Sequence, residues 1–216
     1  MTAQEFFREW YKCLNPIELN NVIAKVRPLY EQRKVYPYFK EIFNAFKFCD
    51  YNELKVVIIG MDPYNDGSAT GLAFANRPNT KVLSPSLQVI KSCLEENYTP
   101  KRQHFDMTLE SWARQGVLLL NSSLTVEDRK PGSHSTMWRK FISTFLQGLG
   151  QWQTGIIYVL MGEQAKTFKP YIGPFNDVIE CKHPAFYART HTPMPNIFEQ
   201  IDNLTWSKNK IKITWI

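Results

Sequence analysis

Short runs of apolar residues recur along the chain, and each ends at a glycine or a polar residue. The runs cover residues 55–60, 117–121 and 156–162, and a weaker one covers residues 176–181. They are continuous rather than alternating and are rich in aliphatic side chains, which is typical of strands buried on both faces of a parallel sheet. The pattern therefore predicts four strands.

Between these runs, apolar residues recur every three or four positions, which is the spacing of amphipathic helices. Strands that alternate with helices predict an α/β fold with a mostly parallel sheet. Asn15-Pro16 predicts a break between two amino-terminal helices. No repeat or linker divides the chain, so we expect one domain, residues 1–216, with the helices of residues 1–35 packed on it. The predicted helices are residues 2–14, 17–30, 38–48, 86–96, 109–115, 137–148 and 164–171.

Each of the four predicted strands is followed by a polar residue or a glycine. Asp62 follows the first strand, Asn121 ends the second, Gly162 ends the third and His183 follows the fourth. The carboxyl ends of parallel strands share one edge of the sheet, where ligands bind. Taken singly, these residues are also compatible with turns, a strand-end cap and a chain break. Their shared position favours one crevice that receives an acid, an amide and an imidazole.

The composition narrows the class of protein without identifying it. The 216 residues are 44% hydrophobic and 21% charged, as in folded globular proteins, and the net charge of +6 permits a polyanionic partner without requiring one. The apolar runs are too short to span a bilayer, and the amino terminus lacks a secretory pattern, so we expect no membrane partner and a cytoplasmic location. The four cysteines are widely spaced, which argues against a zinc site and a redox dithiol.

The sequence lacks several motifs of cofactor and nucleophile chemistry. It has no Gly-x-Ser-x-Gly elbow and no glycine-rich nucleotide loop after a strand, and its four histidines are not paired at metal-ligand spacing. We therefore expect a site with no cofactor and no metal. A carboxylate and a histidine with an amide and an aromatic ring nearby suit hydrolysis at a glycosidic carbon, because they can orient water and stabilise a departing anion.

An ordered set of motifs resembles the uracil-DNA glycosylases of family 1, the Ung type. Asp62-Pro63-Tyr64 and the segment Gly71-Leu-Ala-Phe74 are similar to the first active-site block of that family. The segment 36–48 belongs to the same block, and the segment 109–126, the pair Ser133-His134 with Trp138, the strand that ends at Gly162, and His183-Pro184 follow in the family's order. The resemblance covers residues 36–216. It implies a three-layer α/β/α fold around a central, mostly parallel four-stranded sheet.

The resemblance implies a role for each matched residue in removing uracil from DNA. Asp62 would position the attacking water, and His183 would stabilise the uracil anion. Tyr64 would exclude the thymine methyl group, Phe74 would stack on the flipped base, and Asn121 would distinguish uracil from cytosine. The backbone amides of Met61 and Asp62 would face the uracil O2 atom.

The resemblance also implies residues that grip DNA. Ser84 and Ser86 would bind phosphate at the start of a helix, although Ser84 is equally compatible with an ordinary helix cap. Gly162 begins a phosphate turn, and the loop after His183 would carry the wedge that enters the minor groove. That loop contains Ala185, Phe186 and Tyr187, and the sequence leaves open which aromatic ring is the wedge and whether both pack on the protein instead.

The chain departs from the family pattern at six places. The usual residues before and after the Asp-Pro-Tyr motif are replaced by Met61 and Asn65, and the loop from Tyr64 to Gly71 is one residue shorter. Glu163 places a carboxylate in the phosphate turn, where it would weaken DNA binding unless it swings away. Ala185 replaces a serine, and an aromatic residue, Tyr187, stands where the family has its wedge leucine. Lys166, Lys169, Lys182 and Arg189 could supply positive charge instead.

The leading prediction is a monomeric, monofunctional glycosylase that hydrolyses the N-glycosidic bond of deoxyuridine in single- and double-stranded DNA and leaves an abasic site. Its partners would be uracil-containing DNA and DNA-mimicking inhibitor proteins. The departures keep two alternatives open: a DNA-binding or replication accessory protein with weak or lost activity, and a glycosylase that accepts more bases than uracil.

Overall fold

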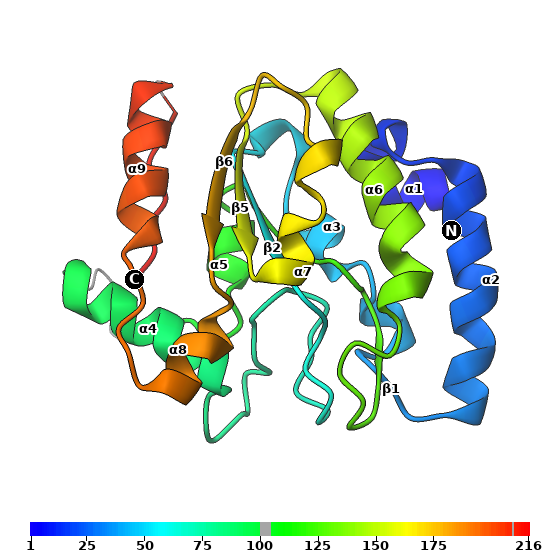
Figure 1. Cartoon of the computed structure of the whole chain (residues 1–216). Helices are drawn as coiled ribbons and strands as arrows, with labels where there is room; N and C mark the ends of the chain where they lie inside the picture. Colours follow the sequence, from blue (N-terminus) through cyan, green and yellow to red (C-terminus); the bar gives the residue numbers. More distant parts are fainter. Residues whose placement is uncertain (100–104, 209) are drawn as a thin grey trace.

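A parallel four-stranded sheet forms the centre of the molecule (Figure 1). The computed structural model describes residues 1–99, 105–208 and 210–216. The strands lie in the order β3-β2-β5-β6, and every neighbouring pair is parallel. This sheet confirms the four predicted strands, which are β2 (Val56–Gly60), β3 (Val117–Asn121), β5 (Ile157–Met161) and β6 (Asp177–Cys181).

Helices cover both faces of the sheet, so the fold has the expected three layers (Figure 1). Alternate strand residues face opposite layers: Val57 and Ile59 pack into one core, and Val56 and Ile58 into the other. The first layer contains α1 (Ala3–Phe7), α2 (Pro16–Gln32), α3 (Asn44–Phe48), α6 (Ser135–Trp152) and α7 (Glu163–Lys166). The second contains α4 (Pro85–Asn97), α5 (Glu110–Ala113), α8 (Pro184–Thr190) and α9 (Ile197–Ser207).

Several predicted helices are shorter or more broken than their apolar spacing indicates. The segment 2–14 is divided at Arg8, whose φ of 49° is left-handed, into α1 and a 3₁₀ helix. The break at Asn15 is confirmed, because its side chain accepts hydrogen bonds from the amides of Ile17 and Glu18 at the start of α2. The segments 38–48 and 164–171 also contain 3₁₀ turns. In the described residues the 3₁₀ helices are Arg8–Cys13, Phe39–Glu41, Tyr51–Glu53 and Lys169–Tyr171.

Two features of the fold contradict or extend the sequence interpretation. The segment after His183, predicted to be a loop, is the helix α8, which Pro184 begins at its first turn. A small antiparallel pair of strands was not predicted. In it, β1 (Val35–Tyr36), which follows α2, is hydrogen-bonded to β4 (Val126–Glu127), which follows β3. Strands of two residues are too short to produce a periodic pattern, so the sequence carried no signal for them.

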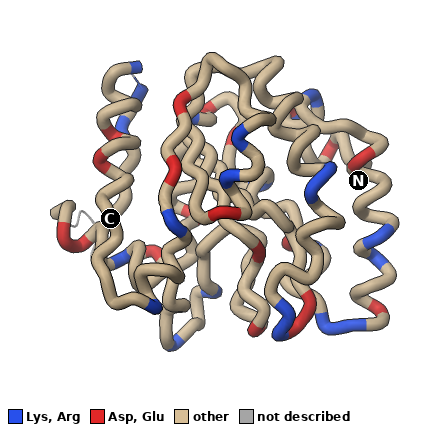
Figure 2. Tube along the Cα trace, viewed as in Figure 1, with Lys and Arg blue, Asp and Glu red and all other residues tan. Residues whose placement is uncertain are grey.

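The loops that follow the strands gather at one end of the sheet, below the strands in Figure 1. Lys and Arg are interspersed with Asp and Glu over the chain rather than gathered on one face (Figure 2). In the part of the chain that the structure describes, no helix has the length and apolar character needed to cross a membrane.

Candidate active site

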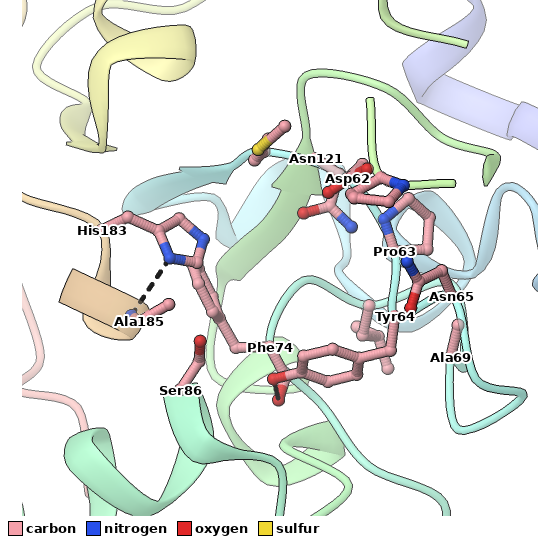
Figure 3. Close-up of a pocket in the computed structure, with 13 residues that line it drawn as sticks. Asp62, Pro63, Tyr64, Asn65, Ala69, Phe74, Ser86, Asn121, His183 and Ala185 are labelled. Carbon is pink, nitrogen blue, oxygen red and sulfur yellow. Dashed lines mark hydrogen bonds between the residues drawn. The ribbon is translucent and has the colours of Figure 1, made fainter. Parts of the chain in front are cut away.

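A pocket of about 210 Å³ opens at the carboxyl ends of the strands (Figure 3). It brings together the acid, amide, imidazole and aromatic side chains that the sequence placed after separate strands. It also contains residues that the sequence did not single out for it, namely Ala69, Leu72 and Pro131. The lining residues are Met61, Asp62, Pro63, Tyr64, Asn65, Ala69, Leu72, Phe74, Ser86, Asn121, Pro131, His183 and Ala185.

The floor of the pocket is set by the pairing of two strands. Gly60 ends β2 directly opposite Asn121, the last residue of β3. A Cβ atom on Gly60 would lie 2.6 Å from the Asn121 Oδ1 atom and 3.0 Å from the Phe74 Cζ atom. Glycine is therefore needed here for the amide and the ring to approach the strand end. The Asn121 amide makes no hydrogen bond to another described residue, so its donor and acceptor remain free for a ligand.

Asp62 is held by a backbone donor from a distant loop. The amide of Gly132 donates to its Oδ2 atom at 2.6 Å, which leaves the second carboxylate oxygen free of that contact. Burial raises the pKa of Asp62, and the hydrogen bond from Gly132 opposes the rise. Gly132 has a left-handed φ of 76°, which favours glycine at this point. Gly132 could not be assigned to the site from the sequence, because a single glycine in a loop carries no signal of its partner.

The loop that carries Gly132 is supported from beneath by a buried polar triad. The Thr125 hydroxyl accepts a hydrogen bond from the Trp138 indole at 2.7 Å and lies 2.9 Å from the His134 Nδ1 atom. Because the indole can only donate, the hydroxyl proton is free to point at the imidazole. Burial lowers the pKa of His134, which favours its neutral form. His134 and Trp138 are therefore structural supports of the site, and Ser133, whose hydroxyl accepts from the Glu127 amide, also lies outside the pocket lining.

Tyr64 and Phe74 form one wall of the pocket. The Tyr64 hydroxyl donates to the Phe74 carbonyl oxygen at 3.0 Å. Phe74 has a left-handed φ of 66°, a conformation that costs a non-glycine residue on the order of 1–3 kcal/mol and so has to be held by its surroundings. The Phe74 and His183 rings lie 5.5 Å apart between centroids, so the wall continues into the imidazole (Figure 3).

The tautomer of His183 follows from its place at the start of α8. Its Nδ1 atom accepts a hydrogen bond from the amide of Ala185 at 3.2 Å, so the proton of the neutral ring is on Nε2 (Figure 3). Burial lowers the pKa of His183 to about 4, with a smaller contribution from the positive charge of Arg189. The pocket therefore contains a neutral imidazole with an N–H available for donation. Gly162 makes room for it, because a Cβ atom there would lie 2.9 Å from the His183 Cβ atom.

The residues predicted to grip DNA are distributed around this pocket. Ser86 is almost fully buried and lines it from the first turn of α4, whereas Ser84 lies at the N-cap without a side-chain capping bond. Ala185 is also in the lining. Tyr187 is buried in the second core, so its ring is not presented as a wedge. Phe186 is only partly buried, and the Lys182 ammonium lies 3.8 Å from the centre of its ring.

Glu163 does not point a free carboxylate into the phosphate turn. It is 85% exposed and pairs with Lys166 at 2.7 Å. Lys169 is likewise paired with Glu180, at 2.6 Å. Two of the four predicted compensating cations are therefore already neutralised, and Arg189 has no ion pair with another described residue. Among the described residues, no group of three or more His, Cys, Asp or Glu side chains could hold a metal ion.

The fold and the site together define an α/β protein whose pocket presents an acid, an amide, a neutral imidazole and an aromatic wall at the carboxyl edge of a parallel sheet. The sequence-family model of the uracil DNA glycosylase superfamily matches residues 46–204 of this chain. A uracil-DNA glycosylase of Campylobacter lari is 33% identical over 217 residues, covering 99% of this chain and 93% of that protein. One from Campylobacter jejuni is 37% identical over 186 residues, covering 84% and 79%.

The crystal structure of a mimivirus uracil-DNA glycosylase has a TM-score of 0.76 at 22% identity and covers 100% of this chain and 93% of its own. A mimivirus UNG variant in complex with UGI has a TM-score of 0.79 at 24% identity, covering 92% and 82%. At these identities the structures support the fold. The family match and the relatives show that the chain belongs to the uracil DNA glycosylase superfamily.

Proposed function

We propose that the protein hydrolyses the N-glycosidic bond of deoxyuridine in DNA, releasing uracil and leaving an abasic site. The observation that carries this proposal is the convergence of Asp62, Asn121 and His183 with the Tyr64–Phe74 wall in one open pocket. A base inside a duplex cannot enter such a pocket, so the nucleotide has to be flipped out of the stack. Membership of the superfamily and the names of the relatives support the same activity.

In this mechanism Asp62 positions the attacking water. Its Oδ2 atom is occupied by the Gly132 amide, which leaves the other oxygen to orient water below the sugar. The carboxylate charge also stabilises the positive charge that develops on the sugar as the bond to the base breaks. One carboxylate oxygen thus holds the side chain in place, and the other acts on the water.

His183 stabilises the leaving group as a neutral donor. Negative charge develops on the uracil as the glycosidic bond breaks, and the Nε2 proton of His183 donates to it. With a pKa of about 4, the imidazole is neutral at neutral pH and acts as a hydrogen-bond donor rather than as a cation. We propose that the backbone amides of Met61 and Asp62 add donors on the same side.

Selection of uracil is assigned to two side chains. The free amide of Asn121 matches the N3–O4 edge of uracil and mismatches the amino edge of cytosine. The Tyr64 ring occupies the space that a 5-methyl group would need, so thymine is rejected by overlap. Phe74 stacks on the base. These assignments favour a uracil-specific enzyme over one that accepts more bases.

DNA contacts are proposed for the rim of the pocket. Ser86 and the free amides at the start of α4 suit a phosphate, because a helix N-terminus attracts anions. Gly162 and Ala185 lie beside His183, and because their amides already donate to the Cys181 carbonyl oxygen and to His183 Nδ1, we propose that they let DNA approach closely rather than donate to it. Of the two aromatic candidates, we propose Phe186 as the wedge, because Tyr187 is buried. DNA-mimicking inhibitors would use the same rim, where Glu163 lowers their affinity.

The decisive experiment is a gel assay with uracil-containing single- and double-stranded oligonucleotides, followed by alkaline cleavage of abasic sites. We expect product from uracil and none from the matched thymine or hypoxanthine oligonucleotides. DNA binding without product would instead support the accessory-protein alternative. We also propose a monomer, to be tested by the mass in solution, and a cytoplasmic location, which four free cysteines favour.

A further inference from the structure

A buried polar side chain, Asn76, ties the segment that follows Phe74 to the start of α4. Asn76 is 1% exposed, and its backbone amide donates to the Met107 carbonyl oxygen at 2.8 Å. Its side-chain Oδ1 atom accepts a hydrogen bond from the backbone amide of Ser84 at 2.9 Å. Its Nδ2 atom makes no hydrogen bond within the described part of the chain. A buried amide is costly, and the bond to Ser84 is the side-chain contact that offsets the cost.

This bond connects the segment that carries Phe74 to the segment that carries Ser86, and both of these residues line the pocket. Asn76 comes two residues after Phe74, and Ser84 comes two residues before Ser86, which lines the pocket from α4. Phe74, Ser86 and Tyr64 all line the pocket, and Ser86 lies beside the Phe74 side chain (Figure 3). The Asn76–Ser84 bond therefore fixes the distance between the aromatic wall and the first turn of α4.

The wall itself is sensitive to such support. Phe74 is held in a left-handed conformation, and the Tyr64 hydroxyl bonds to its carbonyl oxygen. Movement of the segment that follows Phe74 would shift this carbonyl and the Tyr64 ring with it. Ser84 also lies beside the Tyr64 phenol: burial raises the pKa of that phenol, and the Ser84 hydroxyl opposes the rise.

We infer that Asn76 and the backbone amide of Ser84 are a positioning pair that sets base selection by holding Tyr64 and Phe74 at a fixed distance from α4. This inference rests on the proposed function. The pair touches no substrate, and it acts through Tyr64. Its loss widens the pocket on the methyl side, so thymine gains relative to uracil.

The test compares Ser84→Pro with Ser84→Ala. Both variants lose the hydroxyl, and only proline also loses the N–H that bonds to Asn76. Ser84 has a φ of −58°, which proline adopts without strain. We expect the ratio of kcat/KM for uracil to that for thymine to be lower in Ser84→Pro than in Ser84→Ala by about tenfold, as for a lost buried hydrogen bond.

Two further comparisons separate positioning from simple stability. Asn76→Leu removes the acceptor instead of the donor and should shift the ratio in the same direction, which also covers the case in which Ser84→Pro does not fold. In a Tyr64→Ala background, the two Ser84 variants should agree within about twofold, because the side chain through which the pair acts is gone.

The inference and the proposed function fail in different ways. If the wild-type protein releases no uracil, the proposed function is wrong. Titrations of the folded variants with free uracil and free thymine, followed by ligand NMR, then compare base preference without catalysis. Equal base preference in Ser84→Pro and Ser84→Ala overturns the positioning pair, and so does a lower melting temperature without a change in preference.

Discussion

The two sides of the pocket are built in different ways. Gly60 and Asn121 end neighbouring strands, and the register of the sheet places them opposite each other. Asp62 and His183 lie beyond the strand ends and take their final positions from amides of Gly132 and Ala185. The strand side is fixed by repetitive backbone pairing, whereas the loop side depends on single hydrogen bonds. The strand side should therefore be sensitive to added volume, and the loop side to changes of charge or of one donor.

The largest effect is expected on the loop side, at Asp62. Asp62→Asn keeps the size of the side chain and removes the charge that stabilises the developing cation. We expect kcat for uracil release to fall by on the order of 10²–10⁴-fold, measured under single-turnover conditions. Asp66→Asn, at an exposed acid in the same loop, is the matched control and should stay close to wild type. Equal losses in both variants would remove the special role of Asp62.

The second prediction uses the buried imidazole on the loop side. The folded protein holds His183 neutral down to a pKa of about 4, whereas the unfolded chain takes up the proton near pH 6.5. The free energy of unfolding should therefore fall as the pH drops through this window; His183 contributes at most about 3 kcal/mol to the fall, and burial of His134, which also lowers its pKa, acts in the same direction. Urea titrations between pH 4 and 7 measure it.

His183→Asn should remove the larger part of this pH dependence, because asparagine does not titrate, and the part due to His134 should remain. His191→Asn, at an exposed histidine in the same part of the chain, should retain the wild-type slope. Identical slopes in wild type and His183→Asn would show that the imidazole is not held neutral by the fold.

The strand side is tested by adding one methyl group. The Cβ atom of Gly60→Ala would meet the Asn121 Oδ1 atom at 2.6 Å and displace the amide. We expect kcat/KM for uracil DNA to fall by about 10–100-fold, because the base loses a well-placed partner in a buried pocket. At Gly173, the same change meets its nearest atom at 3.4 Å, an ordinary contact, and should leave activity unaltered. Full activity in Gly60→Ala would show that Asn121 can move to accommodate the methyl group without losing its contact with the base.

The smallest effect is expected at the rim. Glu163→Gln removes an exposed negative charge from the predicted phosphate turn and frees Lys166. Binding of single-stranded DNA should tighten by about two- to fivefold at low salt, and the gain should disappear at high salt, where exposed charges are screened. Glu31→Gln is the control, because it makes the same change in net charge at an exposed position in α2. An equal gain in both variants would indicate a general charge effect.

The sequence by itself determined the α/β class, the four buried strands and the residues that follow them. Continuous apolar runs report burial on both faces of a parallel sheet, and such a sheet brings its strand ends to one edge. The apolar pattern is therefore sufficient to place Asp62, Asn121 and His183 together. The ordered motifs supplied Tyr64, Phe74 and the three-layer arrangement by resemblance.

Only the tertiary structure decided which partners hold those residues. Gly132 lies 70 positions from Asp62 along the chain, and a hydrogen bond to a backbone amide leaves no mark on the residue type that donates it. The Asn76–Ser84 bond and the tautomer of His183 likewise depend on backbone amides, which any residue type except proline can supply. The burial of Tyr187 depends on how α8 packs in the second layer. Local patterns report local conformation and burial, whereas contacts between distant segments are set by how the layers pack.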